Sequence, residues 1–209
     1  MPEFYHDLIT EKSFEILQEL RGEFNFVLIG GWAVFAYAKS LKSKDIDIIV
    51  DYNQLEALKE KFEVFKNERL KKYEIKNEEV DIDIYLPHFS EIGIPVEDII
   101  SDYSQSIEGF LAPVPEVLLT LKLYAFSSRQ NSNKGKKDLV DIFSLLSANI
   151  VDWKKYRGII EKYGLKNLNQ KLIEIVSSQR AVLELNLSNH KMARLRKSIL
   201  KNLDYNKYA

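Results

Sequence analysis

The sequence predicts an α/β fold in which helices pack on a mixed β-sheet, followed by a helical C-terminal part. Three observations predict it. Short apolar runs that suit strands alternate with helical patterns before Pro115. From Pro115 onward the pattern is helical, interrupted only by polar loops. Hydrophobic residues make up 45% of the 209 residues, which is enough to bury a core and argues against a disordered chain.

The expected elements before Pro115 follow from apolar periodicity and turn residues. The first four are a helix over residues 10–20, a strand over 24–29, a short buried helix over 32–38 and a strand over 45–50. A helix then runs from a capping box at Asn53 and Glu56 to about residue 65. It is followed by a β-hairpin over 73–76 and 80–86 with its turn at 77–79, a loop-rich connection over 88–102 and an edge strand over 107–114. Helices are then expected over residues 115–129 and 136–146, with about three more after Asn149.

Charge is distributed unevenly along the chain. Residues 1–150 contain 17 Lys and Arg against 26 Asp and Glu, whereas residues 151–209 contain 13 against 5. We therefore expect a domain over residues 1–149 and a basic helical extension over 150–209, with a soft boundary that also allows one globular unit. The two parts can simply attract each other, or the basic extension can offer a surface to tRNA or another RNA.

Composition excludes several classes of protein and site. There are no cysteines, so disulfides and thiolate metal sites are excluded, and three scattered histidines argue against a histidine zinc site. A bound metal would need oxygen ligands, which favours Mg²⁺ or Mn²⁺. No apolar run is long enough to span a bilayer and the N-terminus lacks a signal-peptide pattern, so we expect a cytoplasmic protein without membrane contact.

Two acidic pairs lie in otherwise apolar strands. Asp45 and Asp47 are two positions apart and so share one face of a strand, with Cα atoms roughly 7 Å apart. Asp81 and Asp83 repeat the pattern in a later strand. Carboxylates on neighbouring strands repel one another unless cations neutralise them. An isolated pair could be the wet face of an edge strand, but the repetition among isoleucines and valines favours a metal site.

Gly30 and Gly31 stand where the first strand passes into a helix. Glycines at such a point let a phosphate approach backbone N–H groups at the positive end of the helix. Two glycines alone are common in turns, so the value of this signal comes from its place one strand–helix unit before Asp45.

These residues resemble the signature of the DNA polymerase beta-type nucleotidyltransferase superfamily. The matching residues are Gly30-Gly31, Ser43-Lys44-Asp45-Ile46-Asp47 and an acid on a later strand, within about residues 24–86. The resemblance implies that Asp45 and Asp47 hold Mg²⁺ or Mn²⁺ and that Asp83 or Asp81 is the third catalytic acid. It implies transfer of a nucleoside monophosphate from an NTP to a hydroxyl, with release of pyrophosphate.

The segment after residue 117 is similar to AbiEii-type nucleotidyltransferases, which are toxin-like members of abortive-infection and toxin–antitoxin systems. It contains Leu118-Leu119-Thr120-Leu121-Lys122-Leu123, then Arg129, then Lys137-Asp138-Leu139-Val140-Asp141. The resemblance implies that Lys122 contacts the phosphates and that an antitoxin protein is a partner. Together with the first resemblance, it implies the nucleotide-binding residues Gly30, Gly31, Ser43, Lys122, Arg129, Lys137, Asp138 and Asp141. From the residues alone, Lys122 can also be a lysine whose charged end reaches solvent from the edge of an apolar helix, although a functional role is favoured.

The sequence leaves the acceptor open among a tRNA end, a protein side chain and a small molecule. Two other functions remain as alternatives. One is an antitoxin-like module that binds nucleotide or a partner without turnover, and the other is a glycosyltransferase whose metal motif is Asp45-Ile46-Asp47. The short glycine–helix–acid unit fits the second alternative poorly.

Overall fold

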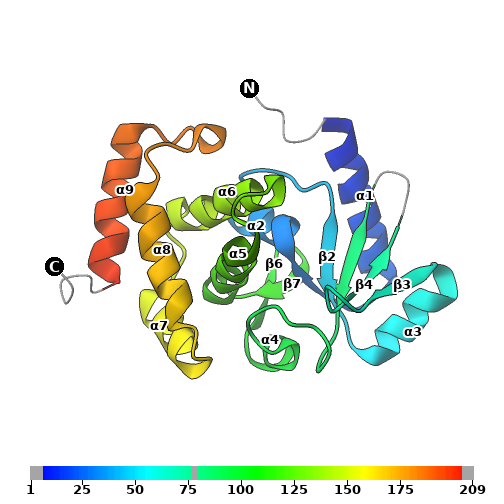
Figure 1. The fold of residues 1–209 in the computed structure, drawn as a ribbon. Coiled ribbons are helices and arrows are strands. Elements are labelled where there is room, and N and C mark those ends of the chain that lie inside the picture. Colours follow the sequence, from blue (N-terminus) through cyan, green and yellow to red (C-terminus); the bar gives the residue numbers. More distant parts are fainter. Residues whose placement is uncertain (1–6, 77–79, 204–209) are drawn as a thin grey trace. The chain divides into compact units, whose positions relative to one another are not determined.

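The computed structural model describes residues 7–76 and 80–203. The chain divides into two compact units, of which the first ends at Val114 and the second begins at Pro115. The predicted fold class is confirmed, because a mixed sheet with helices is followed in sequence by helices (Figure 1). The predicted hairpin turn at residues 77–79 lies outside the described residues.

Helices are interspersed among the strands of the first unit (Figure 1). The helices are α1 (Asp7–Glu23), α2 (Gly30–Ala38), α3 (Tyr52–Lys61) and α4 (Val96–Asp102). The strands are β1 (Val27–Ile29), β2 (Ile46–Ile49), β3 (Val64–Asn67), β4 (Lys72–Ile75), β5 (Ile82–Tyr85), β6 (Ser104–Ile107) and β7 (Phe110–Pro113).

The strands form one seven-stranded sheet in the order β3-β4-β5-β2-β1-β7-β6. β2 is parallel to β5 and β1 is parallel to β7, while the other neighbours are antiparallel. Ile46, Ile48 and Ile84 are fully buried near its centre, and α2 packs against β1 and β2. β2 is therefore an inner strand, and its acids are not on the wet face of a sheet edge.

Three short elements of the first unit were not predicted, namely β3, α4 and β6. Asp51, rather than Asn53, caps α3, since its side chain accepts a hydrogen bond from the Gln54 N–H at 2.8 Å. The helix ends at Lys61, before the predicted end near residue 65, and residues 64–67 form β3.

The strand predicted over residues 107–114 is present as β7, but its predicted position at the edge of the sheet was wrong. β7 lies between β1 and β6, and β6 forms the edge. Glu108 and Gly109 both have positive φ, at 52° and 78°, and join β6 to β7 in a two-residue hairpin turn of the type that suits the twist of a sheet.

The second unit is helical. It contains α5 (Pro115–Arg129), α6 (Asn133–Ser147), α7 (Trp153–Lys162), α8 (Lys166–Ser178), a short 3₁₀ helix (Leu183–Leu185) and α9 (Asn189–Asn202). α5 is buried along most of its length and packs against α6, α7 and α8. Because α5 is the centre of this packing, the structural division falls at Val114 and differs from the soft boundary expected near residue 150.

Candidate functional site

Three carboxylates lie side by side across the sheet of the first unit. Asp47 on β2 is in register with Asp83 on the parallel neighbour β5, and Asp83 is in register with Glu74 on the antiparallel neighbour β4. Directly opposed residues of neighbouring strands point to the same face, so these three side chains form a row, which we call the acid row. Asp45 precedes Asp47 by two residues and extends the acid row at its β2 end.

The register brings Asp83, rather than Asp81, beside Asp47. Asp81 lies just before β5, where its carbonyl accepts a hydrogen bond from the Ile46 N–H. Its side chain is 42% exposed and accepts a hydrogen bond from Lys76 Nζ at 3.1 Å. The two candidates for the third acid therefore differ in environment, because Asp83 is buried within the sheet and the side chain of Asp81 is solvent-exposed just before β5.

Asp45 and Asp47 are half-buried, and no Lys, Arg or His among residues 7–76 and 80–203 forms an ion pair with either. Ser43 is fully buried, and its hydroxyl donates to the carbonyl of Asp45 at 3.0 Å, which fixes the turn that leads into β2. Two half-buried negative charges without a counter-charge are costly to hold together, so this end of the acid row is suited to a cation.

Gly30 is the first residue of α2 and has a φ of +67°, a conformation that favours glycine. A Cβ atom at Gly30 would lie 2.0 Å from Asp47 Oδ2, so the backbone approaches this carboxylate where a side chain would not fit. No side chain caps the N-terminus of α2, and Gly31 is buried in its first turn. The first-turn N–H groups and the helix dipole therefore suit an anion such as phosphate.

We expect Gly30→Ala to lose about 1–2 kcal/mol of unfolding free energy from the left-handed conformation alone. The added methyl also displaces the Asp47 carboxylate, so half-saturation by Mn²⁺ is expected to need a higher concentration. Denaturant unfolding and a Mn²⁺ titration measure the two effects. Gly22→Ala on α1 is the control, since its Cβ would meet nothing within 4 Å. Equal stability and equal Mn²⁺ binding in Gly30→Ala and the wild type would contradict this account.

Lys72 forms ion pairs with the acid row and was not predicted from the sequence. It lies on β4, is 7% exposed, and its Nζ is 2.5 Å from Asp83 Oδ2 and 2.8 Å from Glu74 Oε1. Burial by itself lowers the pKa of Lys72, but hydrogen bonds to Asp83 and Glu74 outweigh it and raise the pKa above its ordinary value. The hydrogen bond from Lys72 lowers the pKa of Glu74. The available signal was the Lys-x-Glu alternation, which places both side chains on one face of a strand.

The donor chemistry of the acid row fits a hard divalent cation, because all its candidate ligands are carboxylate oxygens. Asp45 and Asp47, together with Asp83 on the neighbouring strand, are the residues that would hold Mg²⁺ or Mn²⁺. Within the described part of the chain, however, no three His, Cys, Asp or Glu side chains are already close enough together to hold a metal ion. The ion pair between Asp83 and Lys72 helps to explain this, because it directs the Asp83 carboxylate to an ammonium group and not toward Asp47.

Four predicted residues of the second unit form a cluster of charged side chains, which we call the charge quartet: Lys122, Arg129, Asp138 and Asp141. Both aspartates are at most 2% exposed. Lys122 Nζ lies 2.7 Å from Asp141 Oδ2 and 3.6 Å from Asp138 Oδ1. Arg129 donates two hydrogen bonds to Asp138, from Nε at 2.7 Å and from Nη2 at 3.0 Å.

The charge quartet joins α5 to α6. The turn between them is tight, because Ser132 caps α6 and a Cβ at Gly135 would lie 2.2 Å from the carbonyl oxygen of Arg129. Lys137 is half-buried beside Asp138 on α6. Two cations and two carboxylates balance in charge, so the quartet forms a structural pairing between two helices. The role of Lys122 at phosphates stays a prediction.

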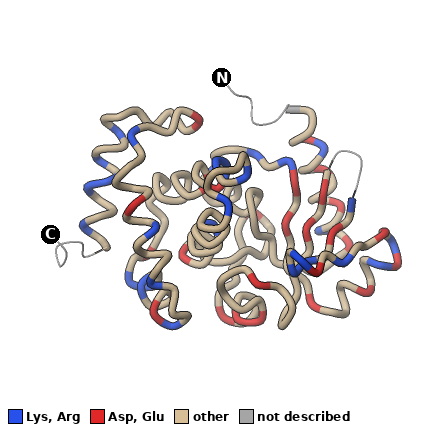
Figure 2. Tube along the Cα trace, viewed as in Figure 1, with Lys and Arg blue, Asp and Glu red and all other residues tan. Residues whose placement is uncertain are grey.

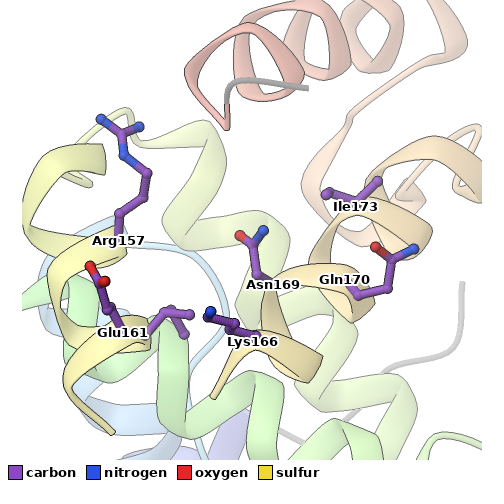
Figure 3. Close-up of a pocket in the computed structure, with 7 residues that line it drawn as sticks. Arg157, Glu161, Lys166, Asn169, Gln170 and Ile173 are labelled. Atoms are coloured by element: carbon purple, nitrogen blue, oxygen red, sulfur yellow. The ribbon is translucent and has the colours of Figure 1, made fainter. Parts of the chain in front are cut away.

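The second unit also contains a hollow of about 620 Å³ between α7 and α8. Figure 3 shows its lining, in which Arg157 and Glu161 come from α7 and Lys166, Asn169 and Gln170 come from α8. None of the predicted site residues lines it. Arg157 is engaged at its rim, since its Nη1 donates to the Asn202 carbonyl at 2.6 Å.

Comparison with known proteins gives similarities at low sequence identity. No family model matches the chain, and the comparison with curated protein sequences found no match. Among solved structures, an antigenic nucleotidyltransferase-like protein from Paracoccidioides brasiliensis is 17% identical, covers 86% of this chain and 93% of its own, and has a TM-score of 0.44. JHP933 from Helicobacter pylori is 15% identical, with coverage of 96% and 94% and a TM-score of 0.47.

The Megavirus polyadenylate synthase is also similar, at 15% identity and a TM-score of 0.47, over 83% of this chain but only 40% of its own. Identities and TM-scores of this size do not place the chain in a family. No helix of the described residues is long and apolar enough to cross a membrane.

Proposed function

We propose that the first unit is the core of a metal-dependent nucleotidyltransferase, with its site at the Asp45 end of the acid row. The observation that carries the proposal is the register of Asp47 with Asp83 on parallel inner strands, beside a helix start where Gly30 leaves no room for a side chain. This arrangement combines oxygen ligands for a divalent cation with backbone N–H groups for phosphate.

The residues of the site take defined roles in the proposed reaction. The N–H groups at Gly30 and Gly31 bind the triphosphate. Asp45 and Asp47 hold Mg²⁺ or Mn²⁺, which when bound would neutralise charge on the phosphates. Asp83 accepts the proton of the acceptor hydroxyl. The hydroxyl oxygen forms a bond to the α-phosphorus, the bond from that phosphorus to the bridging oxygen breaks, and pyrophosphate leaves.

The direct test is incubation of the protein with each labelled NTP, Mg²⁺ and total tRNA. Label on RNA or on the protein, with release of pyrophosphate, supports the proposal and identifies both the nucleotide and the class of acceptor. The same incubation with EDTA is the control and should give no label. No pyrophosphate with any NTP, despite binding in calorimetry, would contradict it.

A second candidate is a module that binds nucleotide without turnover. The contact between Lys72 and Asp83 favours it, since a buried ammonium holds the carboxylate that turnover requires. Calorimetry with each NTP and Mg²⁺ separates the two candidates, because binding without pyrophosphate release is expected only from the second. A toxin-like role and an antitoxin partner rest on the sequence resemblance alone.

We propose RNA as the acceptor because the second unit is basic. Residues 115–209 contain 18 Lys and Arg against 8 Asp and Glu, and Figure 2 shows basic residues along α7, α8 and α9. Arg194, Lys197 and Lys201 are exposed on α9 at a spacing that places them on one face of the helix. Arg196 between them is different, because it donates to the carbonyls of Val176 and Gln179 at the end of α8.

Replacing Arg194, Lys197 and Lys201 together by Gln is expected to weaken tRNA binding and to reduce the slope of log affinity against log salt by about 2, since each phosphate contact to a single strand contributes about 0.7. Fluorescence anisotropy at several salt concentrations measures the slope. The control is Arg196→Gln, which should lower stability by about 1.5–3 kcal/mol through lost hydrogen bonds while leaving the slope near that of the wild type. An unchanged slope in the triple variant would leave these charges without a role in RNA binding.

A further inference from the structure

A buried lysine inside a row of predicted metal ligands needs a physical explanation. Lys72 and the acid row share one face of the sheet, and the register places its two partners, Asp83 and Glu74, directly opposite one another. The side chain of Lys72 is only 8% exposed, so the ammonium group has exchanged water for these two carboxylates. The pairing is thus specific and not a surface contact of a long side chain.

The ion pair between Lys72 and Asp83 makes the two ends of the acid row different. Asp83 lies between Asp47 on β2 and Glu74 on β4, and neighbouring strands of a sheet are about 4.8 Å apart. Asp47 forms no ion pair with any cation of the described residues, whereas Asp83 and Glu74 share Lys72. Asp83 can therefore serve either a cation at Asp47 or the ammonium of Lys72.

We propose that Lys72 is a resident cation of the acid row that competes with the divalent metal for Asp83. The proposal rests on the function proposed above, and it makes Lys72 a positioning residue for Asp83. In the metal-free protein the ammonium neutralises Asp83 and holds it in place. When a divalent cation is held by Asp45 and Asp47, its charge repels the ammonium of Lys72. Glu74, whose Oε1 is 2.8 Å from Lys72 Nζ, is then the carboxylate that retains Lys72.

The competition has a consequence that a purely structural lysine would not produce. Removing the positive charge while keeping the length of the side chain lowers the stability of the metal-free protein in either case. Only a competing lysine also changes the affinity for the metal, because its removal leaves Asp83 and Glu74 as additional negative charge near Asp47. The metal should then bind more tightly, even though the protein itself is less stable.

The test is thermal unfolding of the full chain over a range of Mn²⁺ concentrations, without nucleotide. The dissociation constant for Mn²⁺ follows from the dependence of Tm on Mn²⁺ concentration. For Lys72→Met, this dissociation constant is expected to fall about 10-fold relative to the wild type, a typical size for coupling between charged sites. Lys72→Arg should behave as the wild type does. Lys72→Gln, which keeps a hydrogen-bond donor for Asp83 and Glu74, should show the same fall and serves if Lys72→Met does not fold.

Lys66→Met is the matched control. Lys66 lies on the neighbouring strand β3, its side chain is 45% exposed, and it pairs with Glu68 instead of the acid row. An equal or higher dissociation constant for Mn²⁺ in both neutral Lys72 variants, with a clear rise of Tm with Mn²⁺ in the wild type, would overturn the inference while leaving the metal site intact. No Mn²⁺ response in the wild type at all would overturn the metal site, and this inference with it.

Discussion

Replacement of either Asp45 or Asp47 by Asn is expected to lower Mg²⁺-dependent nucleotidyl transfer by about 10²- to 10³-fold, the range found when one electrostatic contact to a developing charge is removed. Asn keeps the shape of the side chain but loses the charge that holds the cation. The fold should not change, because neither carboxylate forms an ion pair within the described residues. Pyrophosphate release measures the rate, and circular dichroism with thermal unfolding measures the fold.

The control is Asp51→Asn, in the same strand–helix segment. Asp51 caps α3 through its side chain, and Asn is an equally good N-cap residue, so both turnover and stability should stay at wild-type levels. Full activity in Asp45→Asn or Asp47→Asn, once the wild type is shown to be active, would contradict the proposed function.

The same assay decides between Asp83 and Asp81 as the third acid. The register with Asp47 predicts that Asp83→Asn is as damaging as Asp47→Asn, whereas Asp81→Asn should retain most activity because Asp81 is exposed and paired with Lys76. The opposite ranking would assign the role to Asp81.

The sequence predicted the elements that bear the site because those elements have strong local signals. The apolar run before Gly30 and the isoleucines around Asp45 and Asp47 mark inner strands, and they appear as β1 and β2. Pro115 and the apolar periodicity after it gave the bounds of α5, Pro115–Arg129. The short elements β3, α4 and β6 carry weaker patterns, since four to seven residues rarely show a full period.

Register could not be read from the sequence, and it separates Asp83 from Asp81. Both acids have the same local pattern, and only the parallel pairing of β5 with β2 shows which one stands beside Asp47. Lys72 was missed for a related reason. A lysine near a turn is usually solvated, and only the pairing of β4 with β5 makes it a partner of Asp83.

Removal of the Lys122 charge, as in Lys122→Met, is expected to cost about 3–5 kcal/mol of unfolding free energy, the range found when one partner of a buried ion pair is lost. Arg129 still holds Asp138 through two hydrogen bonds. Asp141 is 1% exposed, and neither of its carboxylate oxygens has a hydrogen-bond partner among the described residues, so Lys122 is its counter-charge. Urea unfolding measures the loss, and the exposed Lys136→Met on α6 should stay within about 0.5 kcal/mol of the wild type.

The double variant Lys122→Met with Asp141→Leu separates the structural role of Lys122 from the predicted role at phosphates. Replacing both members of a buried pair by apolar side chains of similar volume is often neutral, so most of the lost stability should return. Transfer activity of this restored protein then tests the resemblance. Loss of activity at recovered stability supports contact of Lys122 or Asp141 with the nucleotide, whereas wild-type turnover shows that transfer requires neither side chain. Stability of Lys122→Met equal to that of the wild type would contradict the charge quartet as a structural link.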